Sequence, residues 1–306
     1  MNLFFILLNK LAVMFLFMAV GTMLFRKGKI TEAGSASLGN ILIYLVLPCV
    51  ILNGFCVERT TVRLQGLLIS IVLSVILLTC SILVSRLVFY KDPIAHFAAA
   101  FANPGFFGIP LILAALGEDS VFYVAPFIAC LNILQWTYGV SCLKGEKIRF
   151  DFKKIIASPF MISFLLGLLL FCTQWQIPGI LKDVITSATA VNTPLAMIIC
   201  GIYIAKVDWK KVIIKKELYL VSLLRLLVAP AIAFIILWMV PNRFYDLKLC
   251  LFIVSSCPVG TNVAVYAQLH NKDYEYAAQT VVISTILSAV TIPLLTTVVQ
   301  NMWMLS

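Results

Sequence analysis

Two short clusters of proline, glycine and amide residues interrupt long apolar stretches of this sequence. The first reads NPGFFGIP at 103–110 and the second reads CPVGTN at 257–262. Proline removes a backbone N–H from a helix and clashes with the preceding turn, and glycine adds backbone freedom, so each cluster predicts a broken helix. The asparagine in each cluster can hydrogen-bond a ligand. The predicted substrate-binding residues at the breaks are Asn103, Pro104, Gly105, Gly108, Pro110, Cys257, Pro258, Gly260, Thr261 and Asn262.

The chemistry that these breaks favour is anion binding. After a break, the next half-helix begins with unpaired N–H groups and the positive end of its dipole. No Asp or Glu lies inside an apolar stretch, whereas Lys10 and Arg225 do. Arg225 is a further candidate substrate-binding residue, but it could equally tie its helix to carbonyls freed at a break. Lys10 is close enough to a stretch end to snorkel to the membrane surface.

The elements that must hold these clusters are membrane-spanning helices. Of the 306 residues, 62% are hydrophobic and 12% are charged, against about 25% charged in a soluble domain. A spanning helix needs about 20 apolar residues. Only Lys10, Arg86 and Arg225 lie within such stretches, which leaves 33 of the 36 charged residues outside them. The ten predicted spans are 3–25, 36–56, 64–90, 94–116, 121–142, 156–175, 184–205, 218–240, 249–269 and 276–302.

Lysine and arginine are distributed unevenly between alternate loops. The loops after the odd-numbered spans hold 16 of them, counting Arg86, and the opposite set holds 5. The positive-inside rule therefore places the first set in the cytoplasm and both termini outside a multi-pass cell (inner) membrane protein. The net charge of +10 is explained by this orientation signal, so nucleic acid is not an expected partner. The first stretch lacks a basic leader and a cleavage pattern, so we expect it to be retained.

The ten spans divide evenly at the basic loop KGEKIRFDFKK, residues 144–154. Five is an odd number, so the second half would cross the membrane in the opposite sense, as an inverted repeat requires. Pro48 and Pro194 lie in the second span of each half, and Pro104 and Pro258 in the fourth. We therefore predict an all-α integral membrane protein of ten transmembrane helices in two inverted five-helix repeats. The repeats are 1–143 and 156–306, joined by a cytoplasmic linker at 144–155, and helices 4 and 9 are broken and cross.

Three motifs resemble one transporter family. The run NPGFFGIPL at 103–111 resembles the fourth-span crossover motif of the auxin efflux carriers, and RLLVAP at 225–230 and CPVGTNVAVYA at 257–267 resemble the eighth and ninth spans of that family. The resemblance covers essentially the whole chain, which lacks the long central loop of the plant carriers and is similar to compact bacterial members. It implies a fold similar to the bile acid–sodium symporters, with Asn103 at the crossover beside the substrate. Thr261 and Asn262 depart from the plant pattern.

The leading hypothesis is a secondary transporter that moves a small organic anion, a mono- or dicarboxylate, by alternating access. An anion channel or a membrane sensor on the same fold is the alternative. The sequence has no HExxH, no paired acids at membrane depth and no phosphate-binding loop, so neither an enzyme nor a primary pump is expected. Its nine cysteines form no CxxC pair, so we expect no metal site and no cofactor. Sodium coupling, proton coupling, uniport and a homodimer are left open, and the expected partners are the anion and the lipid bilayer.

Overall fold

Seven helical segments are long and apolar enough to cross a membrane in the computed structural model, which describes residues 3–147 and 152–305. Three are single helices, α1 (Leu3–Arg26), α4 (Thr61–Val88) and α18 (Tyr274–Leu305). The other four join consecutive helices, where η marks a π-helical or 3₁₀ turn. They are α2 (Glu32–Ile41), η1 (Leu42–Val46) and α3 (Leu47–Phe55); η3 (Glu118–Ser120), α7 (Val121–Leu134), η4 (Gln135–Gly139) and α8 (Val140–Lys144); α11 (Gly179–Ala190) and α12 (Asn192–Lys206); and α14 (Lys216–Leu223), η5 (Leu224–Val228) and α15 (Ala229–Trp238).

The other three predicted stretches hold shorter helices. The sixth stretch contains α10 (Pro159–Thr173), which has only 15 residues. The fourth is divided into α5 (Pro93–Ala100), η2 (Pro104–Gly108) and α6 (Ile109–Leu116), and the ninth into α16 (Tyr245–Ser255) and α17 (Asn262–Leu269). Short helices in the loops are α9 (Phe152–Ile156), α13 (Trp209–Val212) and η6 (Asn242–Phe244). Residues 148–151 of the predicted linker lie outside the described part of the chain.

Polar side chains cap the N-termini of several of these helices. The hydroxyl oxygens of Thr31, Thr60 and Ser158 accept hydrogen bonds from backbone N–H groups in the first turns of α2, α4 and α10. The Asp92 carboxylate accepts two such bonds at the start of α5, at 3.0 and 3.1 Å. These groups satisfy N–H donors that have no partner within the helix. These capping residues therefore mark where α2, α4, α5 and α10 begin.

Three π-helical turns each end two residues before a proline. These turns are η1 before Pro48, η2 before Pro110 and η5 before Pro230. A proline ring clashes with the carbonyl four residues earlier and leaves that carbonyl without its usual donor. A locally wider turn makes room for the ring, so the helix continues through the proline. Pro48 and Pro230 are thus accommodated inside continuous helical segments.

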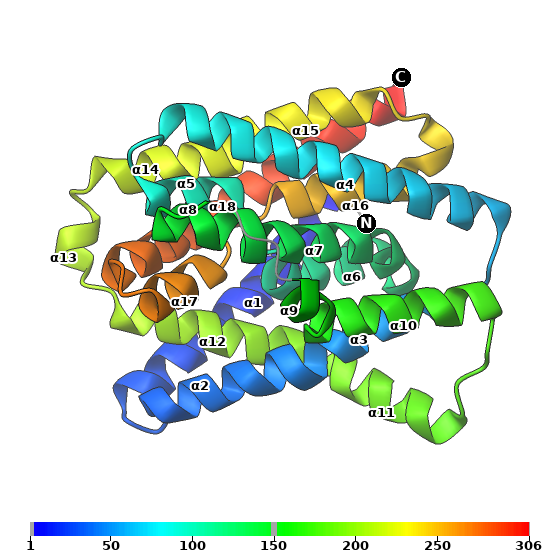
Figure 1. Cartoon of the computed structure of the whole chain (residues 1–306), viewed down its shortest axis with the longest axis horizontal. Coiled ribbons are helices and arrows are strands. Elements are labelled where there is room, and N and C mark those ends of the chain that lie inside the picture. Colours follow the sequence, from blue (N-terminus) through cyan, green and yellow to red (C-terminus); the bar gives the residue numbers. More distant parts are fainter. Residues whose placement is uncertain (1–2, 148–151, 306) are drawn as a thin grey trace.

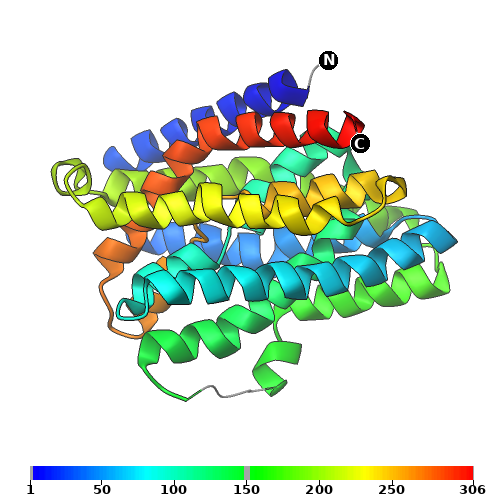
Figure 2. The ribbon, with the colours of Figure 1, turned by 90° about the horizontal axis from the view of Figure 1, so that it is seen from above.

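The long helices pack side by side (Figures 1 and 2). α1 runs along α12 and also packs against α18, and α3 packs against α10 and α11. α4 packs against α5 and α7, and α18 also packs against α14 and α17. The α1–α12 contact is close because a Cβ on Gly21 would collide with the Ile198 backbone, and one on Gly201 with the Met18 backbone. Glycine is therefore required at both positions.

Loops gather at two opposite ends of the molecule. The loops after α1, α4, α12 and α17 lie at the left of Figure 1, and those after α3, α10 and α15 lie at the right. Both chain ends lie towards this second end (Figures 1 and 2). The long apolar helices run between the two ends, as a membrane protein requires.

Candidate functional site

The two interrupted helices meet at their breaks. The Asn103 N–H donates to the carbonyl of Pro258 at 2.9 Å, and the Gly260 N–H donates to the carbonyl of Phe101 at 3.0 Å. Ala102 and Val259 form an antiparallel bridge between these bonds. A Cβ on Gly260 would lie 2.7 Å from the carbonyl oxygen of Ala102, so a side chain there would push the segments apart. The two Pro/Gly clusters of the sequence are thus brought together at one crossing.

Asn103 caps the half-helix that follows the first break. Its side-chain oxygen accepts a hydrogen bond from the Phe106 N–H at 3.3 Å, and its backbone oxygen accepts from Phe107 and Gly108. The sequence predicts unpaired N–H groups at this helix start. Asn103 itself already binds three of them, so fewer donors remain for a ligand than expected. The side-chain amide nitrogen is not used in this cap.

A small cavity of about 50 Å³ lies beside the crossing, and we call it the crossing pocket. Its wall also includes Ile43 and Leu47 from the second predicted span and Asn132 from α7. Asn103 is 6% exposed and Thr261 is 4% exposed, so the polar groups here are shielded from bulk solvent. Six predicted site residues line the pocket: Asn103, Pro104, Gly105, Gly260, Thr261 and Asn262.

Four other predicted site residues are buried behind the pocket wall: Gly108, Pro110, Cys257 and Pro258. A Cβ on Gly108 would lie 3.1 Å from Val254 and 3.2 Å from the sulfur of Cys257, so the two helices approach closely there. The Cys257 thiol donates to the carbonyl of Ile253 at 3.3 Å. These residues shape the crossing and do not line the crossing pocket.

Arg225 is placed away from the crossing pocket and binds helix ends. One guanidinium nitrogen donates to the Ser81 hydroxyl at 3.2 Å and to the carbonyl of Ala100 at 3.3 Å, and another donates to the carbonyl of Ser255. Ala100 and Ser255 are the last residues of α5 and α16, directly before the two breaks. A cation is favourable at helix C-termini, where carbonyls lack donors. Of the two roles predicted for Arg225, these contacts favour the structural one. Lys10 does not line the crossing pocket.

Sequence reasoning missed two amides on the fifth predicted span. The Asn262 amide nitrogen donates to the side-chain oxygen of Gln135 at 2.7 Å, and Gln135 is fully buried. The amide nitrogen of Asn132 donates to the carbonyl of Ile128 in its own helix at 2.9 Å, which leaves its side-chain oxygen as an acceptor at the pocket. The signal was present, because residues three apart share a helix face and both are amides in an apolar stretch.

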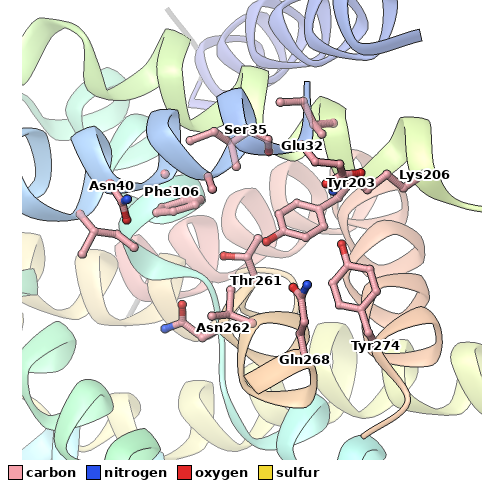
Figure 3. A pocket seen from close by; sticks show the side chains of 16 residues that line it. Glu32, Ser35, Asn40, Phe106, Tyr203, Lys206, Thr261, Asn262, Gln268 and Tyr274 are labelled. Carbon is pink, nitrogen blue, oxygen red and sulfur yellow. Dashed lines mark hydrogen bonds and ion pairs between the residues drawn. The ribbon is translucent and has the colours of Figure 1, made fainter. Parts of the chain in front are cut away.

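A larger cavity of about 370 Å³ extends from the crossing to Glu32 and Lys206, which lie next to the loops after α1 and α12 (Figure 3). We call it the vestibule. Its wall shares Ile43, Phe106, Thr261 and Asn262 with the crossing pocket, so the two cavities adjoin. Its other polar wall residues come from α2, α12, α17 and the start of α18: Glu32, Ser35, Asn40, Tyr203, Lys206, Gln268 and Tyr274. Sequence reasoning assigned none of these to a site.

The comparisons with known proteins identify the family. The model of a family described as "Membrane transport protein" matches residues 6–154 and 146–296. The chain belongs to this family. The expected resemblance to the auxin efflux carriers is thereby confirmed, and the family consists of transporters, not enzymes.

Two relatives are transporters by name. A "Putative malonate transporter" of Rhizobium meliloti (strain 1021) is 25% identical over 274 residues, which cover 83% of this chain and 84% of that protein. An "Uncharacterized transporter" of Methanothermobacter thermautotrophicus is 26% identical over 200 residues, which cover 64% of this chain and 65% of that protein. The match thus spans just under two thirds of the second relative's length.

Proposed function

We propose that the protein is a secondary transporter that moves a small organic anion, a mono- or dicarboxylate, across the cytoplasmic membrane by alternating access. The observation that carries the proposal is the crossing itself. Two interrupted helices bind each other through backbone hydrogen bonds beside a pocket lined by Asn103, Asn132 and Asn262. Irregular backbone at membrane depth is tolerated where it is buried in protein or lines a cavity. A substrate in this pocket would contact both broken helices.

The composition of the crossing pocket supports an anionic substrate. No Asp or Glu is among the described residues that line it, and the Asn103 amide nitrogen is a donor at its wall. A cation would usually need an acidic partner at this depth. The name of the Rhizobium relative refers to malonate, a dicarboxylate, and so supports the same chemical class. Without an acid in the pocket, we expect no carboxylate proton relay through it.

We further propose ten spans in two inverted repeats, residues 1–143 and 156–306, around a linker at 144–155. Three observations support this architecture. The broken helices approach each other antiparallel, through the Ala102–Val259 bridge. The two segments that match the family model overlap only at 146–154. Each proposed half carries its break in its fourth span, at Pro104 and Pro258. The protein is proposed to lie in the cell (inner) membrane with both termini on the external side.

A thermal-shift screen of the purified protein tests the proposed substrate class. The screen uses acetate, malonate and succinate, each with and without sodium. A ligand that binds only the folded state raises the apparent unfolding temperature. We expect at least one carboxylate to do so and a neutral analogue, malonamide, to have no effect. A shift with malonamide equal to that with malonate would contradict the proposed anion site.

Counterflow in proteoliposomes separates a carrier from the alternative channel. A carrier preloaded with unlabelled substrate accumulates labelled substrate transiently and saturates with concentration. Conductive flux without saturation or counterflow would contradict alternating access and favour a channel on the same fold.

A further inference from the structure

The vestibule carries a single pair of opposite charges near the loop end. Glu32 and Lys206 are the only charged residues in its described wall, and they form an ion pair. Glu32 is the first residue of α2 and Lys206 is the last residue of α12. Figure 3 shows the pair at one side of the cavity, with Tyr203 between it and Thr261 and Tyr274 on the wall below Lys206. Any anion that reaches the crossing pocket through the vestibule passes this lysine.

The two partners are unequally exposed. The Lys206 side chain is 20% exposed, and its ammonium lies 5.3 Å from the centre of the Phe25 ring, so the lysine is held in place by packing. The Glu32 side chain is 72% exposed. A carboxylate at a helix N-terminus is also favoured by the helix dipole whether or not it binds a lysine. Exposed ion pairs contribute little to stability, so Glu32 can leave Lys206 at small cost.

We propose that Lys206 is an entrance contact for the carboxylate group of the substrate, and that Glu32 occupies this place when no substrate is bound. This inference rests on the proposed function and adds a second point of anion contact to it. The incoming carboxylate takes the place of the Glu32 carboxylate on the ammonium, and the released Glu32 side chain, which is 72% exposed, is solvated by water. The tyrosine hydroxyls of Tyr203 and Tyr274 line the path from this contact towards Thr261 and the crossing pocket.

The alternative is a structural tie between α2 and α12, and opposite effects of two substitutions distinguish the two roles. If Glu32 competes with substrate, Glu32→Gln frees the lysine and strengthens anion binding, whereas Lys206→Gln weakens it. If the pair only ties the helices, both substitutions remove the same contact, so both lower the unfolding temperature and change binding in the same direction. The double variant separates the two roles further, because Glu32→Gln should have no additional effect on anion binding once Lys206 has been replaced.

The experiment measures the dissociation constant of labelled malonate for the purified full chain in lipid nanodiscs at low salt. We expect Lys206→Gln to raise the constant about threefold to tenfold, and Glu32→Gln to lower it by a similar factor, as loss or gain of one exposed charge contact predicts. The double variant should behave like Lys206→Gln. Lys210→Gln and Glu217→Gln are matched controls, because both residues are exposed and lie outside the vestibule wall.

Two results would overturn the inference. Malonate binding that is unchanged in Glu32→Gln and Lys206→Gln would show that Lys206 is not a contact, while the proposed function would stand. Absence of malonate binding to both the wild type and Glu32→Gln would also overturn it, because a freed lysine in this cavity is expected to hold a small dicarboxylate. The proposed function is then judged separately, by the wider carboxylate screen and the Asn103 variants.

Discussion

Asn103 has an observed capping role and a proposed binding role at the first break. Its side-chain oxygen caps the half-helix by accepting from the Phe106 N–H, and we propose that its amide nitrogen, which takes no part in the cap, donates to the substrate in the crossing pocket. Serine can keep a capping oxygen but has no amide nitrogen. Asn103→Ser should therefore weaken carboxylate binding with little loss of stability. The expected loss is several-fold to a hundred-fold, since leaving a buried polar contact unpaired costs about 1–3 kcal/mol.

Asn103→Ala should lose both roles, with a further stability cost of about 1 kcal/mol for the missing cap. Ser158→Ala is the matched control, because Ser158 caps α10 outside the crossing pocket. It should lower the unfolding temperature without changing anion affinity. Wild-type affinity in a folded Asn103→Ser variant would remove Asn103 from the site.

The contacts of Arg225 predict a folding defect on substitution. Arg225→Gln removes charged donors from the buried carbonyls of Ala100 and Ser255, at an expected cost on the order of 3 kcal/mol. Arg225→Lys keeps the charge but loses the planar fork that reaches both helix ends, so it should be intermediate. The yield and unfolding temperature of detergent-solubilised protein measure this. Normal yield with abolished anion binding would instead make Arg225 a substrate contact.

The candidate site could be predicted from the sequence only where the chemistry is local. Proline and glycine act on their own backbone, so the breaks at 103–110 and 257–262 were visible in the sequence. The direction of the Arg225 side chain depends on where α5 and α16 end in space, and the sequence left its two roles equal. Gln135 was visible as one of two amides in an apolar stretch, but its pairing with Asn262 was not, because the two residues are 127 positions apart.

Close contacts between helices also escape sequence reasoning. The contact of α1 with α12 depends on Gly21 and Gly201, which nothing in the hydrophobic pattern distinguishes from other glycines. Gly201→Ala places a Cβ against the Met18 carbonyl and should separate the two helices. We expect a loss of about 1–3 kcal/mol in stability, as for other overpacking substitutions, measured as a fall in unfolding temperature.

Gly39→Ala in α2 should change the stability of the protein in the opposite direction. A Cβ there meets nothing within 4 Å, and Gly39 lies inside α2. Alanine should therefore stabilise the helix by up to about 1 kcal/mol. Equal behaviour of Gly39→Ala and Gly201→Ala would contradict the close packing of α1 on α12.

At the scale of the whole molecule, hydrophobicity and length located the helices well. The seven long segments coincide with seven predicted stretches to within a few residues, because a continuous apolar run of spanning length is itself the signal. The hydrophobic pattern was a less reliable guide to where each helix begins and ends. Lys248 was assigned to a loop, but it lies in α16, where it is 1% exposed and its ammonium binds Asn242 at 2.8 Å and lies 4.6 Å from the Trp303 ring centre.

The separation of loops into two ends makes the proposed orientation testable. Glu58 lies in the loop between α3 and α4, at the end that also carries both termini, and Lys210 lies on α13 at the opposite end. Because the positive-inside rule places the Lys210 end in the cytoplasm, a membrane-impermeant maleimide should label Glu58→Cys in intact cells. It should label Lys210→Cys only after permeabilisation. Both variants need a background without the nine native cysteines, of which Cys56 and Cys172 are exposed. Labelling of Lys210→Cys in intact cells, with Glu58→Cys protected, would reverse the orientation and place the vestibule and its Glu32–Lys206 pair on the outer face.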